Sequence, residues 1–114
     1  MSLPVKESHV LRQVLHYLAL RGYWHWRNNT GAMPIDAPGG RRYVRFGSPG
    51  MPDICVRIRD GNGKWRDGET IWIECKSPKG RQNEDQKAWE GLALRHGDRY
   101  IVARSLDDVI GVGL

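Results

Sequence analysis

Apolar residues recur at helical spacing in two stretches of the chain. Val10, Val14 and Leu18 are spaced one helical turn apart and predict a first helix over residues 6–21. A second helix is expected over residues 83–96, where the spacing of an asparagine and a glutamine at the start is typical of a capping box. Both helices carry an apolar stripe, so each is expected to pack against other parts of the fold.

Four shorter runs are alternating or wholly apolar, and these patterns predict β-strands. The runs cover residues 23–27, 54–58, 71–75 and 99–103, and the third of them is apolar on both faces, as in a central strand. A last short helical turn is expected over residues 105–110. The β–α–β unit formed by the last two strands should cross over right-handed, which makes those strands parallel.

The segment 28–50 is rich in glycine and proline and is expected to be mostly irregular. Within it, residues 41–46 alternate enough to predict one short strand, with Arg41 and Arg45 on the same face. Irregular segments of this length are usually functional or mobile. Because this one leads directly to Asp53, we expect it to form part of a substrate groove, and a flexible basic linker is the alternative.

The elements together predict an α/β protein with a mixed β-sheet flanked by helices, in the order α-β-(β)-β-β-α-β-α. A length of 114 residues suits a single domain over residues 1–114. Trp24 and Trp26 would share one face of the first strand. They are expected to belong to the core or the sheet surface, with stacking on nucleobases as the alternative.

Composition adds a preference for anionic partners. The chain has 18 basic and 13 acidic residues and a net charge of +5, which favours binding to polyanions, although solubility alone could explain it. No apolar run approaches the ~20 residues needed to cross a bilayer. The two cysteines lie in predicted strands and are expected to be buried free thiols. The absence of C-x-x-C and of paired histidines argues against a zinc site.

The chemistry of the chain concentrates on Asp53, Glu74 and Lys76. A glycine-rich turn over residues 60–63 lies between two of the predicted strands, so these strands should form a β-hairpin. Glu74 and Lys76 are two residues apart and leave the same face of their strand. Asp53 opens the preceding strand, and closure of the hairpin would bring it to Glu74.

Two carboxylates about 4 Å apart repel by roughly 4 kcal/mol at an effective dielectric constant of 20. A hard divalent cation, Mg²⁺ or Mn²⁺, would neutralise such a pair through oxygen ligands. Such an ion acidifies water and stabilises charge on phosphate, while Lys76 could hold or deprotonate the attacking water or neutralise developing charge. The combination predicts a phosphodiester hydrolase, and a structural salt bridge between Lys76 and a carboxylate is the alternative.

These residues resemble a known nuclease motif. Pro52-Asp53 with Glu74-Cys75-Lys76 is similar to the PD-(D/E)xK motif, and the wider pattern resembles the virus-type replication–repair nuclease (VRR-NUC) domain in its small stand-alone form. The wider pattern comprises Glu7, residues 47–53, Ser77-Pro78, Gln86 and Gly97. The resemblance extends over almost the whole chain and implies a restriction-endonuclease-like fold.

The resemblance also implies roles for individual residues. It makes Asp53, Glu74 and the backbone carbonyl of Cys75 metal ligands, with Glu7 as a further acidic ligand, direct or through water. It assigns Lys76 to the nucleophilic water and places Gln86 nearby. From the sequence alone, Glu7 could equally be a favourable charge at a helix N-terminus, and Gln86 could simply cap its helix.

The resemblance implies a Mg²⁺- or Mn²⁺-dependent DNA endonuclease similar to Holliday-junction resolvases, acting as a homodimer without an organic cofactor or a membrane anchor. The expected location is the cytoplasm of a bacterial or phage-infected cell. A non-cleaving DNA-binding module and a nuclease for single-stranded DNA or RNA are the alternatives. Phosphate contacts are expected from exposed residues around the site, or these residues are ordinary surface groups. They are Arg41, Arg45, Ser48, Lys79 and Arg81.

Overall fold

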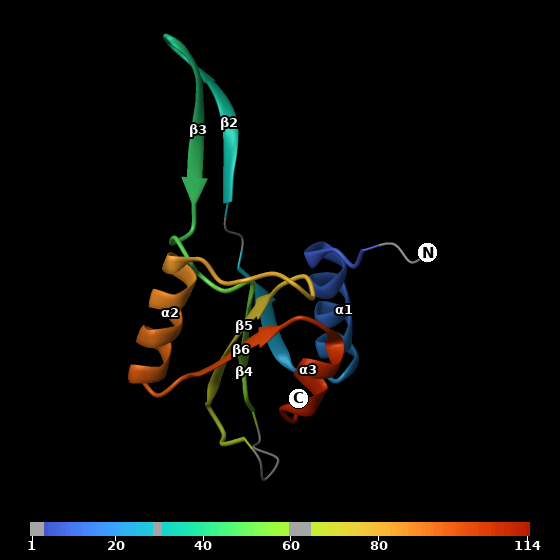
Figure 1. Ribbon diagram of the computed structural model, residues 1–114. Helices are drawn as coiled ribbons and strands as arrows, with labels where there is room; N and C mark the ends of the chain where they lie inside the picture. Colours follow the sequence, from blue (N-terminus) through green and yellow to red (C-terminus); the bar gives the residue numbers. More distant parts are fainter. Residues whose placement is uncertain (1–3, 29–30, 60–64) are drawn as a thin grey trace.

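The structure of the protein is a computed structural model that describes residues 4–28, 31–59 and 65–114, without the side chains of residues 31–33 and 44–46. It has the predicted mixed α/β architecture (Figure 1). In chain order the elements are α1 (Glu7–Leu20), β1 (Trp24–Arg27), β2 (Gly31–Ala37), β3 (Gly40–Phe46), β4 (Ile54–Arg57), β5 (Thr70–Cys75), α2 (Glu84–Arg95), β6 (Arg99–Ala103) and α3 (Leu106–Gly111).

The main sheet has four strands in the order β1-β4-β5-β6. Strand β4 is antiparallel to both of its neighbours, β1 and β5, whereas β5 and β6 are parallel and are joined through α2. The predicted parallel pairing of the last two strands is therefore confirmed. Helix α2 lies on one side of the sheet, and α1 and α3 lie on the other (Figure 1).

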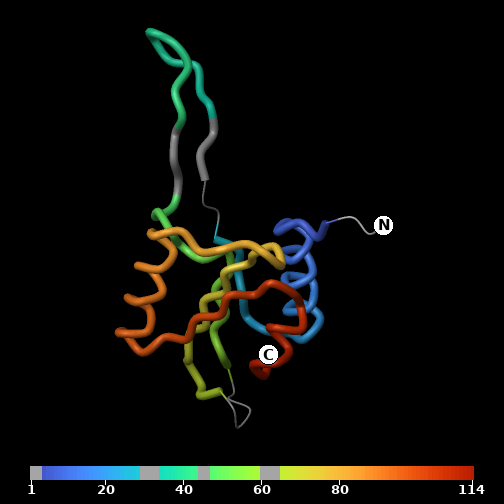
Figure 2. The backbone as a smooth tube through the Cα atoms, in the orientation of Figure 1, coloured from blue at the N-terminus to red at the C-terminus, as the bar shows by residue number. Residues whose placement is uncertain are grey.

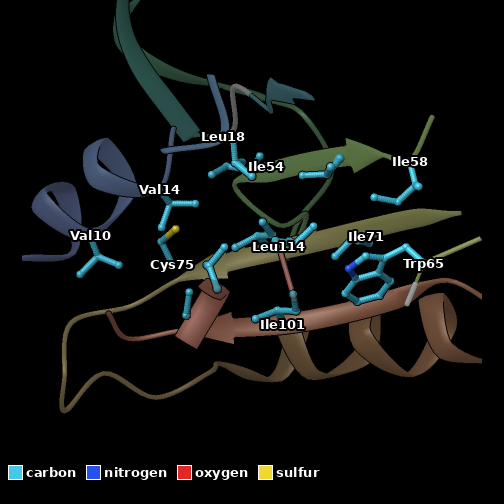
Figure 3. Close-up of a cluster of buried hydrophobic side chains, with 14 residues drawn as sticks. Val10, Val14, Leu18, Ile54, Ile58, Trp65, Ile71, Cys75, Ile101 and Leu114 are labelled. Carbon is cyan, nitrogen blue, oxygen red and sulfur yellow. The ribbon is translucent and has the colours of Figure 1, made fainter. Parts of the chain in front are cut away.

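The core forms between α1 and one face of the sheet. Ile71, Ile73 and Cys75 alternate along β5 and point toward the buried stripe of α1, which consists of Val10, Val14 and Leu18 (Figure 3). The intervening residues Trp72 and Glu74 point to the α2 side. Both cysteines are buried free thiols, as expected. Among the described residues, no helix combines the length and apolarity needed to span a bilayer.

The prediction for residues 28–50 was wrong about regular structure. The chain forms a two-stranded antiparallel hairpin in which β2 pairs with β3 from Gly31–Phe46 to Ala37–Gly40. This β2–β3 hairpin projects from the body of the molecule (Figures 1 and 2). Strand β2 was missed because Pro34 and the surrounding glycines are typical of loops, yet proline is tolerated in a strand that has only one partner.

The segment between β4 and β5 contributes a buried aromatic residue, because Trp65 within it is only 7% exposed. Its indole N–H donates to the carbonyl of Gly113 at 3.1 Å, and the Arg99 guanidinium lies 5.6 Å from the ring centroid. Trp65 is thus part of the hydrophobic core. The predicted glycine turn over residues 60–63 lies outside the described residues.

Helix α2 begins with the predicted capping box, in which the side chains of Asn83 and Gln86 each accept a backbone N–H of the other residue at 2.9 Å. The predicted apolar stripe of this helix packs only in part. Ala93 is buried and Trp89 contacts Trp72 edge to face at 5.6 Å, but Leu92 is 48% exposed. The capped end therefore contributes much of what fixes the helix over the sheet.

Candidate active site

The register of β4 and β5 brings the two predicted carboxylates together. Ile54 lies opposite Ile73 in an antiparallel pair, so Asp53, one residue earlier, faces Glu74, one residue later. The alternation of strand side chains places both carboxylates on the face that α2 covers. The candidate site therefore lies where β5 ends, next to the first turn of α2 (Figure 1).

Asp53 is held in position through both its side chain and its backbone. Its Oδ2 accepts the backbone N–H of Cys75 at 2.8 Å, which ties the start of β4 to the end of β5. The backbone N–H of Asn28 donates to the carbonyl of Asp53 at 2.7 Å, and Nδ2 of Asn28 donates to the carbonyl of Pro52 at 3.0 Å. Asn28 was not singled out from the sequence, because its partners are more than twenty residues away.

Glu74 is almost completely buried, with 2% of its surface exposed. Its Oε1 accepts a hydrogen bond from Nε2 of Gln86 at 2.8 Å, whereas its buried Oε2 has no hydrogen-bond partner among the described residues. An unsatisfied buried carboxylate oxygen is costly unless another group supplies positive charge or a proton. Glu74 therefore has one oxygen fixed by Gln86 and a second, Oε2, that a cation or a proton could satisfy.

The surroundings favour the neutral form of both acids. The pKa of Glu74 is raised from 4.5 to about 8, mainly by burial and also by the charge of the nearby Asp53, while the ammonium of Lys76 opposes the shift. Burial also raises the pKa of Asp53, against the hydrogen bond from Cys75, and the charge of Glu7 raises it too. A cation between the two acids would reverse this tendency and let both ionise.

Lys76 is 8% exposed, and its backbone N–H donates to the carbonyl of Ala103 at 2.9 Å. Its charge acts on both Asp53 and Glu74, so the ammonium lies close to the acids. Ion pairs between described residues are Arg41–Asp36, Lys87–Glu84 and Arg99–Glu69. Lys76 takes part in none of these pairs, so the structural salt bridge is not the arrangement seen here.

Gln86 has both of the alternative roles considered from the sequence. Its Oε1 accepts the N–H of Asn83 in the helix cap, while its Nε2 donates to Glu74. The loop before Asp53 is fitted to the same helix end, because Gly50 packs against it with φ of 81°. A Cβ on Gly50 would lie 2.2 Å from the carbonyl oxygen of Asp85. Direct contacts therefore join the start of α2 to the loop before Asp53 and to Glu74, and we refer to this arrangement as an interlock.

Glu7 lies exposed in the first turn of α1, where a carboxylate is a favourable charge for the helix N-terminus. Its charge still raises the pKa of Asp53 and Glu74, so the carboxylate is near the site. Among the described residues, however, no three side chains of Asp, Glu, His or Cys converge closely enough to enclose a metal. The role of Glu7 as a metal ligand, direct or through water, stays a prediction.

The donors that are present fit a hard divalent cation. Two carboxylates face each other, and Oε2 of Glu74 lacks a partner. In a β-strand the N–H and C=O of a residue point to the same side, so the Cys75 carbonyl lies on the side of Asp53. Mg²⁺ is commonly held by one or two carboxylates and completes its shell with water and substrate phosphate, so no third side chain is required.

The predicted phosphate contacts fall into two groups. Ser48, Lys79 and Arg81 are exposed in the loops that adjoin the site, and Arg104 fixes the second of these loops by two hydrogen bonds to the carbonyl of Gly80, at 3.1 and 3.2 Å. Arg41 is exposed on the β2–β3 hairpin, away from the acids. Arg45 lies in β3, and its side chain is outside the described residues.

Comparison with known proteins identifies one relationship. The family model of the VRR-NUC domain matches residues 6–107, which is nearly the whole chain and includes every residue of the candidate site. Neither the curated proteins nor the solved structures gave a match.

Proposed function

Because this chain belongs to the VRR-NUC family of nuclease domains, we propose that it is a metal-dependent endonuclease that hydrolyses phosphodiester bonds of DNA. The observation that carries the proposal is the pairing of Asp53 with the buried Glu74, whose Oε2 has no partner among the described residues. Nuclease-type activity follows from the family. The metal, the mechanism and the kind of DNA are our proposals.

Asp53, Glu74 and the carbonyl of Cys75 would hold the cation, Mg²⁺ or Mn²⁺, which when bound acidifies water and stabilises charge on phosphate. Gln86 orients Glu74 by donating to its Oε1, which would leave Oε2 to bind the cation. The N–H of Cys75 fixes Oδ2 of Asp53 in the same way. Both carboxylates are therefore aimed before any ligand arrives, which lowers the reorganisation needed for catalysis.

Lys76 would act on the nucleophile. The residue is nearly buried, and its ammonium is close to both acids and in no ion pair between described residues, so it is available to orient the attacking water or to stabilise the charge that develops on the phosphate. These two roles both require a charged ammonium next to the carboxylates. The burial of Lys76 strengthens its electrostatic effect, because little solvent screens it.

The basic surroundings support nucleic acid as the substrate. Lys79 and Arg81 follow the site along the chain, and Arg41 and Arg42 are exposed on the hairpin that emerges next to it. A non-cleaving binding module is less consistent with the site, because buried acids close to a phosphate would weaken binding unless they served a cation. We further propose a homodimer that selects branched DNA, since two symmetric sites suit paired cuts on two strands.

The decisive experiment measures cleavage by the purified full chain. Labelled duplex, nicked, flapped, forked and four-way-junction DNA should be tested with Mg²⁺, with Mn²⁺ and with excess chelator, alongside single-stranded DNA and RNA. We expect cutting of branched DNA only when a metal is present. Robust cutting in chelator would overturn the mechanism, and preferred cutting of RNA would overturn the substrate. A mass measurement in solution tests the dimer.

The role of Lys76 has its own test. Lys76→Ala should lower the single-turnover rate by roughly 10²–10³-fold and leave DNA affinity nearly unchanged, because the ammonium acts in the transition state. Lys87→Ala, on the exposed side of α2, is the matched control and should cut normally. A loss of affinity without a slower chemical step would contradict this role.

A further inference from the structure

Two tryptophans on β1 are exposed although nothing in the catalytic proposal uses them. Trp24 is 60% exposed and Trp26 is 39% exposed. Their rings pack edge to face, with centroids 5.6 Å apart and planes inclined by 61°. The sequence left open whether these rings belong to the core, and the structure answers that they lie on the sheet surface. Exposed tryptophans in contact with each other are unusual enough to require an explanation.

The pair lies on the same sheet face as the two acids. Trp26 is opposite Cys55 in the antiparallel pairing of β1 with β4, and Asp53 is two residues before Cys55 on that face. Trp26 and Asp53 are therefore diagonal neighbours, roughly 7–8 Å apart. That distance corresponds to about two stacked nucleotides at roughly 3.4 Å each.

Helix α2 covers only half of this face. It lies over β5 and β6, where Trp89 contacts Trp72, whereas β1 at the far edge remains exposed. Tyr23, the residue before β1, packs against the core and donates to the carbonyl of Leu114 at 3.0 Å. The chain at β1 therefore packs against the core on its inward side, and the outward face of β1 is accessible to a ligand.

The charges around the two tryptophans indicate the kind of ligand that this face binds. Arg57 lies directly opposite Trp24 on the same face, and Arg27 follows Trp26 on the edge strand, with its side chain leaving the other face by strand alternation. Both arginines are exposed. Aromatic rings among arginines complement a nucleic-acid strand, whose bases stack and whose phosphates are negative. A second copy of this chain would instead bring the same arginines together.

We propose that Trp24 and Trp26 form a stacking platform for unpaired nucleobases of the strand being cut. Bases inside a duplex cannot offer their faces to a side chain, so the platform selects DNA that is single-stranded or unpaired next to the cleaved phosphate. This inference rests on the proposed function, because it names the kind of substrate that the same site accepts. It also gives branch selectivity a physical basis.

The test measures binding without cleavage. Fluorescence anisotropy in excess chelator follows a labelled oligo-thymidine strand of about 12 nucleotides and a blunt duplex of equal length. The double variant Trp24→Leu/Trp26→Leu should bind the single strand roughly tenfold more weakly and the duplex nearly normally. Trp26→Phe should retain most single-strand affinity, because it keeps an aromatic face. Leu20→Ala, which removes another exposed apolar side chain, should change neither affinity.

Several outcomes would overturn the platform. They are unchanged oligo-thymidine binding by the double variant, equal losses on both probes, or a Phe variant as weak as the Leu variant. Dissociation of a dimer with single-strand affinity retained would assign the surface to a second copy. If the double variant fails to fold, absence of tryptophan quenching when wild type is titrated with oligo-thymidine overturns it instead. This binding experiment measures no cleavage, so a failure of the stacking platform is distinguished from a failure of the nuclease mechanism, which the cleavage assay tests.

Discussion

The candidate site and the β2–β3 hairpin are held in opposite ways, although they are neighbours in the chain. Glu74 is 2% exposed and is fixed by Gln86, and Asp53 is fixed by Cys75. On the hairpin, the side chains of Asp36 and Arg41 are 98% and 68% exposed and approach each other only to 4.0 Å. The side chains of the candidate site are therefore preorganised, as catalysis requires. Those of the hairpin are not, and a surface that adapts to a long ligand does not need to be.

The largest expected effect comes from removing the Asp53 carboxylate, with removal of a hairpin carboxylate as the matched control. Asp53→Ala should reduce cleavage by at least about 10³-fold, because it removes charge that the cation and the transition state need. Asp36→Ala removes an equally negative group from the hairpin and should cut at least as well as wild type. A cleavage assay on one branched substrate compares them. Similar rates for the two variants would show that Asp53 is not in the catalytic centre.

Substitution of one glycine in each region gives a second comparison of the candidate site with the hairpin. Gly50 and Gly39 both have a positive φ, at 81° and 89°, so alanine is strained at either position. Only at Gly50 would the new Cβ meet backbone, 2.2 Å from the carbonyl oxygen of Asp85, whereas nothing lies within 4 Å at Gly39. We expect Gly50→Ala to lower the free energy of unfolding by about 2–4 kcal/mol and Gly39→Ala by about 1 kcal/mol.

Urea denaturation measures both values, and single-turnover cleavage adds a second readout. Gly50→Ala should also slow the chemical step, because the loop before Asp53 and the helix that holds Gln86 must separate. Equal stability losses at the two glycines would mean that the loop moves away freely and that the interlock is weak.

The buried acid predicts a pH dependence of stability. The pKa of Glu74 is about 8 in the folded chain and 4.5 in the unfolded one, so the folded state binds more protons between these values. Metal-free protein should therefore lose stability as pH rises from about 5 to 8, on the order of 2–4 kcal/mol. Glu74→Gln should remove most of this loss. Glu84→Gln, on an exposed side chain, should leave it unchanged.

Urea denaturation in chelator at several pH values makes that measurement. Added Mg²⁺ should restore stability to wild type at the alkaline end, since the cation binds the folded state. A wild-type protein with flat stability across this range would show that Glu74 is already ionised without a cation.

The smallest expected effect belongs to the hairpin. Arg41→Ala and Arg42→Ala should each weaken duplex binding a few-fold and reduce the slope of log affinity against log salt by about 0.9, as for one lost phosphate contact. The single-turnover rate at saturating DNA should not change. Arg12→Ala, on the exposed side of α1, is the control. An unaltered salt slope in both hairpin variants would mean that the hairpin does not contact DNA.

The parts of the fold that the sequence predicted are those governed by local periodicity. The stripe of Val10, Val14 and Leu18 and the two-residue spacing of Glu74 and Lys76 each depend on neighbours in the same element. The convergence of Asp53 with Glu74 could also be anticipated, because the apolar residues of both strands must share one buried face, and this limits the possible registers. The roles of these residues in catalysis stay predictions.

What could not be predicted depends on contacts between distant segments. Asn28 supports Pro52 and Asp53 from more than twenty residues away, and nothing in its own surroundings indicates this. Gly50 has the appearance of ordinary loop punctuation until α2 is placed against it. Strand β2 was hidden by Pro34, whose tolerance there depends on the strand having only one partner.

The amide of Gln86 connects the integrity of a helix to the competence of an enzyme. Its oxygen closes the first turn of α2 and its nitrogen grips Glu74, so fraying of that turn releases the acid at the same moment. Helix ends open far more readily than a sheet does. A copy in which this turn has opened would therefore lose the orientation of Glu74 while its sheet remains folded.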